Sequence, residues 1–229
     1  LDGPRDGTPR TIGLSGLSPA EVATLAREEL GFSLPEPRVT MLQSQCHGNP
    51  FFIIELLALL RHESGDAGDT SGGGKLDAIL AGERSLPHTI RQTLTRRLDR
   101  LGIACRTLLR VGAVLGERFD IALLAEIAGQ ERAVCEQLLD DAVAARLLDE
   151  DPDGPGGYAL THGLLCRALY DELLPSQRRR LHARAAAALA ARGATDALAD
   201  MERVAYHYTR AKDHGKGANL PPHTPSILS

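Results

Sequence analysis

Apolar residues recur along most of this chain at intervals of three and four, which is the spacing of one helix face. The segment Ser18–Glu21 (SPAE) is a capping box with proline at the first helical position. An apolar stripe then runs over Val22–Leu30, and Gly31 is expected to end the helix. A second helix is expected at Val39–Gln45. A third, apolar nearly all round and therefore buried, follows from Pro50.

The middle of the chain repeats this helical spacing. A stripe over Ile90–Leu101 is followed by three expected helices at Cys105–Leu115, Ile121–Ala128 and Glu131–Ala145. The stretch Arg146–His162 (RLLDEDPDGPGGYALTH) reads as two short strands joined by a turn. Three helices followed by a β-hairpin is the order of a winged-helix domain.

The last part of the chain returns to helical spacing. Helices are expected at Leu164–Leu174, Gln177–Arg192 and Asp196–Lys212, and the last two are typical of the start of an α-helical repeat array. The Gly/Ser/Asp-rich stretch Ser64–Ser85 predicts a flexible linker, and the tail beyond Gly215 predicts disorder. The predicted fold class is mainly α, with a winged helix carrying a short β-hairpin and then the start of a TPR-like helical array.

Composition adds limits on location and partners. Aromatic residues make up 3% of the chain, and the formal charge of −4 gives no global electrostatic case for nucleic-acid binding. The four cysteines show no metal-binding spacing, which predicts reduced core thiols in a cytoplasmic protein. The longest apolar run, Phe51–Leu60, is too short to span a bilayer, so no membrane association is expected.

Three familiar motifs are incomplete. Gly72–Lys75 (GGGK) lacks the Ser or Thr and the preceding strand of a phosphate loop. The segment Asp149–Leu160 begins like a calcium loop but lacks the bidentate glutamate at its end. His162 and Cys166 lie one helical turn apart without further zinc ligands at fitting spacing. No complete catalytic site is visible, so enzymatic activity stays open and no metal site is predicted.

Two other places remain as candidate binding sites. In CHGNPFF, Gly48 permits close backbone approach, Asn49 suits an N-cap, and Pro50 suits the first helical position. This is either a well-made helix start or a surface that faces a ligand. His162 ends a strand and starts a helix, with Arg167 five residues on, and an imidazole there can donate to a phosphate. Composition alone favours the alternative, in which the histidine caps the helix.

Several of these segments together resemble a known family. In order along the chain they read GLSPAEVATLAR, CHGNPFFIIELL, LPHTIRQTLTRRLDRL, LLRVGAVLGERFD, LLDDAVAARLL and YALTHGLLCRALYDELLPSQRRRLHARAAAAL. This order resembles the signal-transduction ATPases with numerous domains (STAND), an AAA ATPase-related class, and in particular the bacterial large ATP-binding regulators of the LuxR family. The resemblance covers Gly13–Lys212.

The resemblance implies a division of the chain into modules. In order, these are the end of an NTPase core or a lead-in (1–17), a helical lid (18–63), a flexible linker (64–85), a winged helix (86–174), the start of helical repeats (175–214) and a disordered tail (215–229).

The resemblance also implies roles for individual residues. Gly48-Asn49-Pro50 matches the family's G-x-P motif, whose proline packs on the adenine of bound ADP or ATP. His162 matches the histidine that contacts the β-phosphate in the ADP-bound, closed state, and Arg167 would support the same site. Thr161 and Gly163 stand where better-known relatives have Met and Asp, so the sequence departs from the family around the phosphate contact.

The implied function is a nucleotide-controlled switch in signal transduction and transcription regulation. ADP would hold the lid and winged helix against the protein's own N-terminal P-loop NTPase core, which would also bind Mg²⁺, and ATP with an inducer would release them. An inducer or protein partner would bind the helical repeats. This chain would be a fragment of an ATPase that lacks the phosphate loop, and DNA contact would belong to a separate domain.

Two alternatives come from other classes. In the first, the winged helix binds DNA directly, although Glu131–Ala145 carries four carboxylates against Arg132 alone. In the second, the helices after Ser176 form a protein-interaction scaffold, with Arg178–Arg180 as a docking face.

Overall fold

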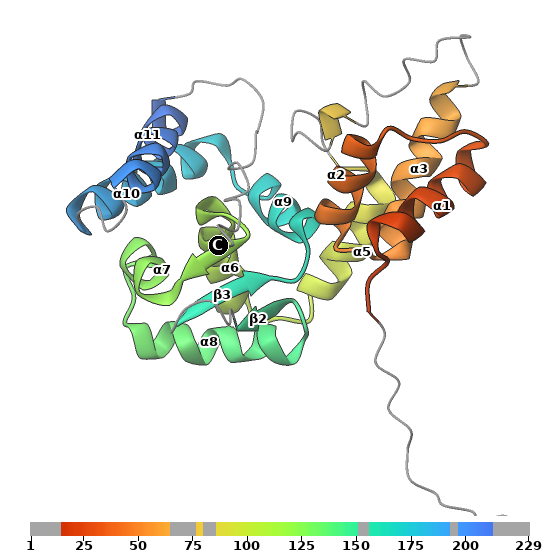
Figure 1. Cartoon of the computed structure of the whole chain (residues 1–229). Coiled ribbons are helices and arrows are strands. Elements are labelled where there is room, and N and C mark those ends of the chain that lie inside the picture. The colour runs from red at the N-terminus through yellow and green to blue at the C-terminus, as the bar shows by residue number, and fades with distance from the viewer. Residues whose placement is uncertain (1–14, 65–76, 80–85, 151–155, 193–196, 213–229) are drawn as a thin grey trace, which may run out of the picture.

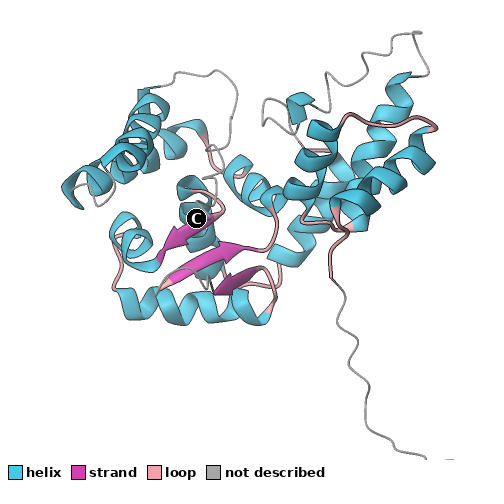
Figure 2. Cartoon of the chain, viewed as in Figure 1, coloured by secondary structure: helices cyan, strands magenta, loops and turns pink. Residues whose placement is uncertain are grey.

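The computed structural model describes residues 15–64, 77–79, 86–150, 156–192 and 197–212. Within these residues the protein is mainly helical, with one small antiparallel sheet (Figure 2). This confirms the predicted fold class as mainly α. The predicted linker and tail lie almost entirely outside the described residues, as does most of the possible strand at Thr11–Leu17; its last residues, 15–17, are not in a strand.

The N-terminal helices pack around one another on one side of the molecule (Figure 1). They are α1 (Pro19–Leu30), α2 (Glu36–Cys46), α3 (Pro50–Ser64) and α5 (His88–Leu98). The expected capping box is present: Glu21 Oε2 accepts from the Ser18 backbone N–H at 2.8 Å, and Ser18 Oγ accepts from Glu21 N–H. Helix α2 begins three residues earlier than expected, because prolines are compatible with the first turn of a helix.

The sheet unit comprises the helices and strands from α6 to α9. They are α6 (Ile103–Leu115), β1 (Arg118–Asp120), α7 (Ile121–Ala128), α8 (Arg132–Ala144), β2 (Leu148–Glu150), β3 (Gly157–Leu160) and α9 (Gly163–Asp171). The two expected strands are present. The expectation of a two-stranded hairpin was nevertheless incomplete, because β1 pairs antiparallel with β3 and gives the strand order β1-β3-β2.

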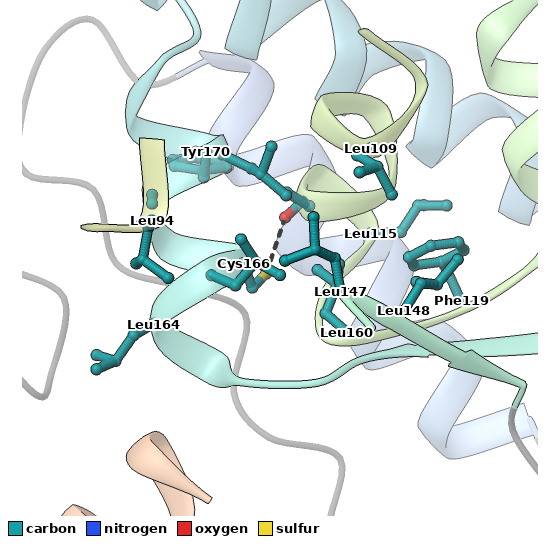
Figure 3. Packing of buried hydrophobic residues seen from close by; sticks show 14 of the residues in the cluster. Leu94, Leu109, Leu115, Phe119, Leu147, Leu148, Leu160, Leu164, Cys166 and Tyr170 are labelled. Atoms are coloured by element: carbon teal, nitrogen blue, oxygen red, sulfur yellow. Dashed lines mark hydrogen bonds between the residues drawn. The ribbon is translucent and has the colours of Figure 1, made fainter. Parts of the chain in front are cut away.

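The core of the sheet unit lies between the strands and helices α6 and α9 (Figure 3). The ring of Phe119 packs directly on Gly112 of α6, where any side chain would collide with it. On the other strand the ring of Tyr158 stacks against Phe119, with centroids 6.3 Å apart. The Cys166 thiol of α9 donates a hydrogen bond to the Ala113 carbonyl oxygen, with Sγ and oxygen 3.6 Å apart, and this bond connects α9 to α6.

Helices α10 (Pro175–Arg192) and α11 (Ala197–Lys212) form an antiparallel pair that packs on α6 and α7 (Figure 1). Helix α9 ends at Asp171, before the expected Leu174, and Pro175 begins the next helix instead of only breaking the previous one. Helix α9 contacts α2 and α5 among the N-terminal helices, and α6 and β3 within the sheet unit.

Candidate functional site

The turn between α2 and α3 is built from two consecutive residues in the left-handed region. His47 has φ 48° and Gly48 has φ 68°. The Gly48 N–H donates to the Gln43 carbonyl at 3.1 Å, and the Asn49 N–H donates to the Cys46 carbonyl at 2.9 Å. Hydrogen bonding thus fixes this turn, and with it the point where α3 begins.

The start of α3 has the geometry that its sequence predicts. Asn49 Oδ1 accepts from the Phe51 N–H at 3.1 Å, and Pro50 is the first residue of the helix. Pro50 is exposed, and Phe51 and Ile54 beside it are 43% and 38% exposed although both are large apolar residues. This end of α3 therefore offers an apolar surface that the described residues leave uncovered.

Gly48 is explained by packing within the chain. The space that a side chain would take is filled by the Leu17 backbone, whose N–H donates to the Gly48 carbonyl at 2.8 Å. Gly16 is packed equally closely against the His47 carbonyl. The close backbone approach expected at Gly48 is thus present, but its partner is this lead-in segment, so an adenine contact depends on Pro50.

His162, which lies between β3 and α9, packs against the α2–α3 turn. Its ring lies edge-on to two rings, 5.8 Å from that of His47 and 5.5 Å from that of Phe52, measured between centroids. His162 is the N-cap residue of α9, as the alternative interpretation expects, but its side chain makes no capping hydrogen bond. Its Nδ1 atom is buried and has no hydrogen-bond partner among the described residues.

Three effects together lower the pKa of His162 from 6.5 to about 4: burial is the largest, and the electrostatic effects of His47 and Arg97 act in the same direction. The imidazole is therefore neutral at pH 7 and carries one N–H donor. An anion placed here would accept that hydrogen bond and offset the positive charge of Arg97. The local chemistry thus fits an oxygen-rich anion better than a metal ion.

Arg167 is placed differently from the other candidates. It lies on α9, its side chain is 3% exposed, and its Nε donates to Asp171 Oδ2 at 3.1 Å. That bond directs the guanidinium toward the C-terminal end of the helix, whereas His162 stands at the N-terminal end. The structure thus places His162 against the α2–α3 turn. The bond of Arg167 to Asp171 instead directs its guanidinium away from that turn.

Three residues at this corner escaped the sequence analysis. His47 stands directly before the singled-out glycine, Phe52 lies within the helix predicted to be buried, and Arg97 lies within the predicted Ile90–Leu101 segment. Only the first had a visible signal, which was its place beside Gly48. We call the contact of His47 and Phe52 with His162 the front joint.

A second buried polar cluster joins the sheet unit to the C-terminal helix pair. The Tyr170 hydroxyl lies 2.9 Å from His182 Nε2, and His182 Nδ1 lies 2.8 Å from His207 Nδ1. The two histidines are 1% and 2% exposed. Burial lowers the pKa of both, so both are neutral and a single proton lies between the two Nδ1 atoms. We call this chain of three side chains the rear joint.

The structure gives little support to the two alternatives, DNA binding through the winged helix and a docking face at Arg178–Arg180. On α8, the one arginine named above, Arg132, is bound to Glu136 at 2.7 Å, and Glu131, Asp140 and Asp141 are exposed. These carboxylates would repel DNA phosphates. Arg178, expected on a docking face, instead lies over the Tyr170 ring at 4.6 Å and is partly buried.

Within the described residues, no group of three or more His, Cys, Asp or Glu side chains is arranged to hold a metal ion. No helix in this part of the chain is long and apolar enough to cross a membrane. The four cysteines are buried and unpaired, as the sequence predicts for core thiols.

Neither a family model nor a curated protein matches this sequence. The resemblance to STAND regulators therefore stays a hypothesis, and the geometry of the front joint has to support any function on its own.

Proposed function

We propose that this chain is part of a nucleotide-controlled switch that regulates a transcription factor, and that it supplies adenine and phosphate contacts to an NTPase core. One observation carries the proposal. The α2–α3 turn and the start of α9, distant in sequence, meet through the rings of His47 and His162. The buried Nδ1 atom of His162 has no partner among the described residues, and Pro50, three residues after His47, is exposed.

The front joint and the exposed residues at the start of α3 together fit ADP or ATP in two respects. The exposed ring of Pro50, with Phe51 and Ile54 on the same helix face, suits a flat purine. The buried donor of His162, close to the positive charge of Arg97, suits a phosphate oxygen. The nucleotide would supply the adenine ring and the phosphate charge. In this proposal Mg²⁺ and the phosphate loop belong to the core, since no metal cluster is found in the described part of this chain.

In this mechanism His162 donates its single N–H to the anion, and α3 presents Pro50 to the base. The two contacts come from different modules, so a ligand that makes both favours the arrangement in which the modules touch. A ligand shifts such an equilibrium only by its differential affinity for the two arrangements. The switch is proposed to act in the cytoplasm, where buried thiols stay reduced.

The proposal is tested by titrating ADP into the chain labelled with ¹³C and ¹⁵N in histidine, and recording the ring resonances. We expect those of His162 and His47 to shift and to saturate with a dissociation constant of about 1 mM, because the core is missing. Pro50→Ser should weaken binding about tenfold. The matched control, Pro37→Ser, alters an exposed proline in the first turn of α2 and should leave binding unchanged.

Inorganic pyrophosphate separates the two contacts. It should shift His162 with an affinity that does not depend on Pro50, since it lacks a base. The proposal is refuted if ADP at about 10 mM leaves the His162 ring unchanged, or if Pro50→Ser binds ADP as well as the parent chain does.

A further inference from the structure

The first residue of α9 leaves a notch that two other side chains fill. Gly163 is buried, and a Cβ atom added to it would lie 3.0 Å from Gln45 Oε1 and even closer to Glu117 Oε1. The two side chains come from different parts of the fold, since Gln45 belongs to α2 and Glu117 leads into β1. A carboxylate oxygen and an amide oxygen therefore both lie where most residues would place their own side chain.

Glu117 is held at this notch by its own backbone. Its carbonyl oxygen accepts from the Leu160 N–H at 2.8 Å, which ties the segment before β1 to the end of β3. Its charge also raises the pKa of Cys166, after the larger effect of burial. Cys166 lies three residues after Gly163, so the carboxylate lies along the first turn of α9. A negative charge is favourable at that end of a helix.

Gln45 connects the notch to the front joint. Its side chain is 5% exposed, and it lies two residues before His47 near the end of α2. Across the notch, Gly163 directly follows His162. The notch therefore lies beside the front joint: His162 is adjacent to Gly163, and His47 is two residues after Gln45.

We propose that Glu117 is a positioning residue of the nucleotide switch: its carboxylate, seated over Gly163 beside Gln45, fixes the end of α2 against the start of α9. It thereby sets the separation of His47 and His162. The role of Glu117 in a nucleotide switch rests on the proposed function. Its effect on the packing of α2 against α9 does not require a nucleotide.

The first test measures amide hydrogen exchange in the whole 229-residue chain without nucleotide. The probes are the Gly48 and Asn49 amides, which are hydrogen-bonded within the turn. Glu117→Ala should speed their exchange about tenfold and shift the His162 ring resonances, because the end of α2 loses the carboxylate that it packs beside. Glu117→Gln keeps the shape of the side chain and should restore exchange to within about twofold. Unchanged exchange in Glu117→Ala would overturn the proposal.

The second test is a double-mutant cycle with Gly163→Ala. In the parent chain the added methyl group collides with the Glu117 carboxylate and should speed exchange of the same two amides. In the Glu117→Ala background only the milder contact with Gln45 Oε1, at 3.0 Å, remains, and a much smaller increase is expected. Gly102→Ala is the matched control, because an added Cβ there meets no atom within 4 Å. An equal effect of Gly163→Ala in both backgrounds would contradict the proposal.

These readouts contain no nucleotide, so they are independent of the ADP titration. If ADP fails to bind while the exchange results hold, the proposed function fails and the positioning role stands. If ADP binds and the exchange results fail, the reverse conclusion follows.

Discussion

The front and rear joints each contain a histidine ring nitrogen that is buried, but they differ in hydrogen bonding. At the rear joint both ring nitrogens of His182 have partners, in Tyr170 and His207. At the front joint the buried Nδ1 of His162 has none among the described residues. A satisfied polar chain is what a permanent contact requires. An unsatisfied one costs stability, and such a cost is usual where a ligand or a moving part completes the site.

The pH dependence of stability should be the largest effect and should involve both joints. Unfolded histidines take up a proton near pH 6.5, whereas folded His162 stays neutral down to about pH 4 and the rear-joint histidines also have lowered pKa values. The unfolded state therefore binds more protons in this window. The stability is fully present above pH 6.5 and falls as the pH drops toward 4, by up to about 1.4 kcal/mol per pH unit for each histidine.

Urea unfolding followed by circular dichroism at several pH values measures this slope. His162→Leu should make the slope shallower by the share of one histidine, which separates the histidine effect from that of the carboxylates. An unfolding midpoint that does not change between pH 7.5 and 5 would contradict the burial of these rings.

Replacing one histidine in each joint should change stability by very different amounts at pH 7.5. His182→Leu leaves the Tyr170 hydroxyl and the His207 Nδ1 atom buried without their partner, and should lower the free energy of unfolding by about 3 kcal/mol. His162→Leu removes a polar atom that has no partner in the described structure, and should change stability by less than about 1 kcal/mol. Equal losses in chemical denaturation would remove the distinction between the joints.

A smaller effect is expected from the arginine that covers the rear joint. Arg178 lies over the Tyr170 ring and donates to the Asp171 carbonyl at 3.1 Å. Arg178→Ala should lower the free energy of unfolding by about 1 to 2 kcal/mol. The matched control is Arg180→Ala, an exposed position on the same helix, which should cost less than about 0.5 kcal/mol. Similar thermal midpoints for the two variants would place Arg178 outside the joint.

The smallest effect should come from Arg192 at the end of α10. It forms ion pairs at 3.2 Å with both Asp120 and Glu126, but all three side chains are well exposed to solvent. Arg192→Ala should therefore cost no more than about 0.5 kcal/mol, and less at high salt. A loss as large as that of Arg178→Ala would show that surface pairing helps to hold the helix pair in place.

The sequence predicted best the features that depend on neighbouring residues. The caps at Ser18 and Asn49 each involve a bond from a backbone N–H two or three residues on, so the pattern of a few residues is enough. Strand β1 was missed because three residues, Arg118–Asp120, are too few to show alternation. Its pairing depends on β3, which is distant along the chain.

The candidate site was predicted only in part. The resemblance singled out Pro50 and His162, but periodicity alone gave no reason for them to meet. The rear joint was missed entirely, because Tyr170, His182 and His207 belong to three different helices and lie 12 or more positions apart along the chain. The notch at Gly163 escaped for the same reason, since the carboxylate that fills it comes from another element.

The burial of the four cysteines has a practical consequence for measuring distances between the N-terminal helices and the C-terminal helix pair. Burial raises the pKa of Cys46 to about 12 and that of Cys105 to about 11, so almost no thiolate is present at neutral pH. Maleimide dyes react with thiolates on accessible cysteines. A pair of cysteines introduced on the outer faces of α3 and α11 can therefore carry fluorophores for energy-transfer measurements without first removing the native thiols.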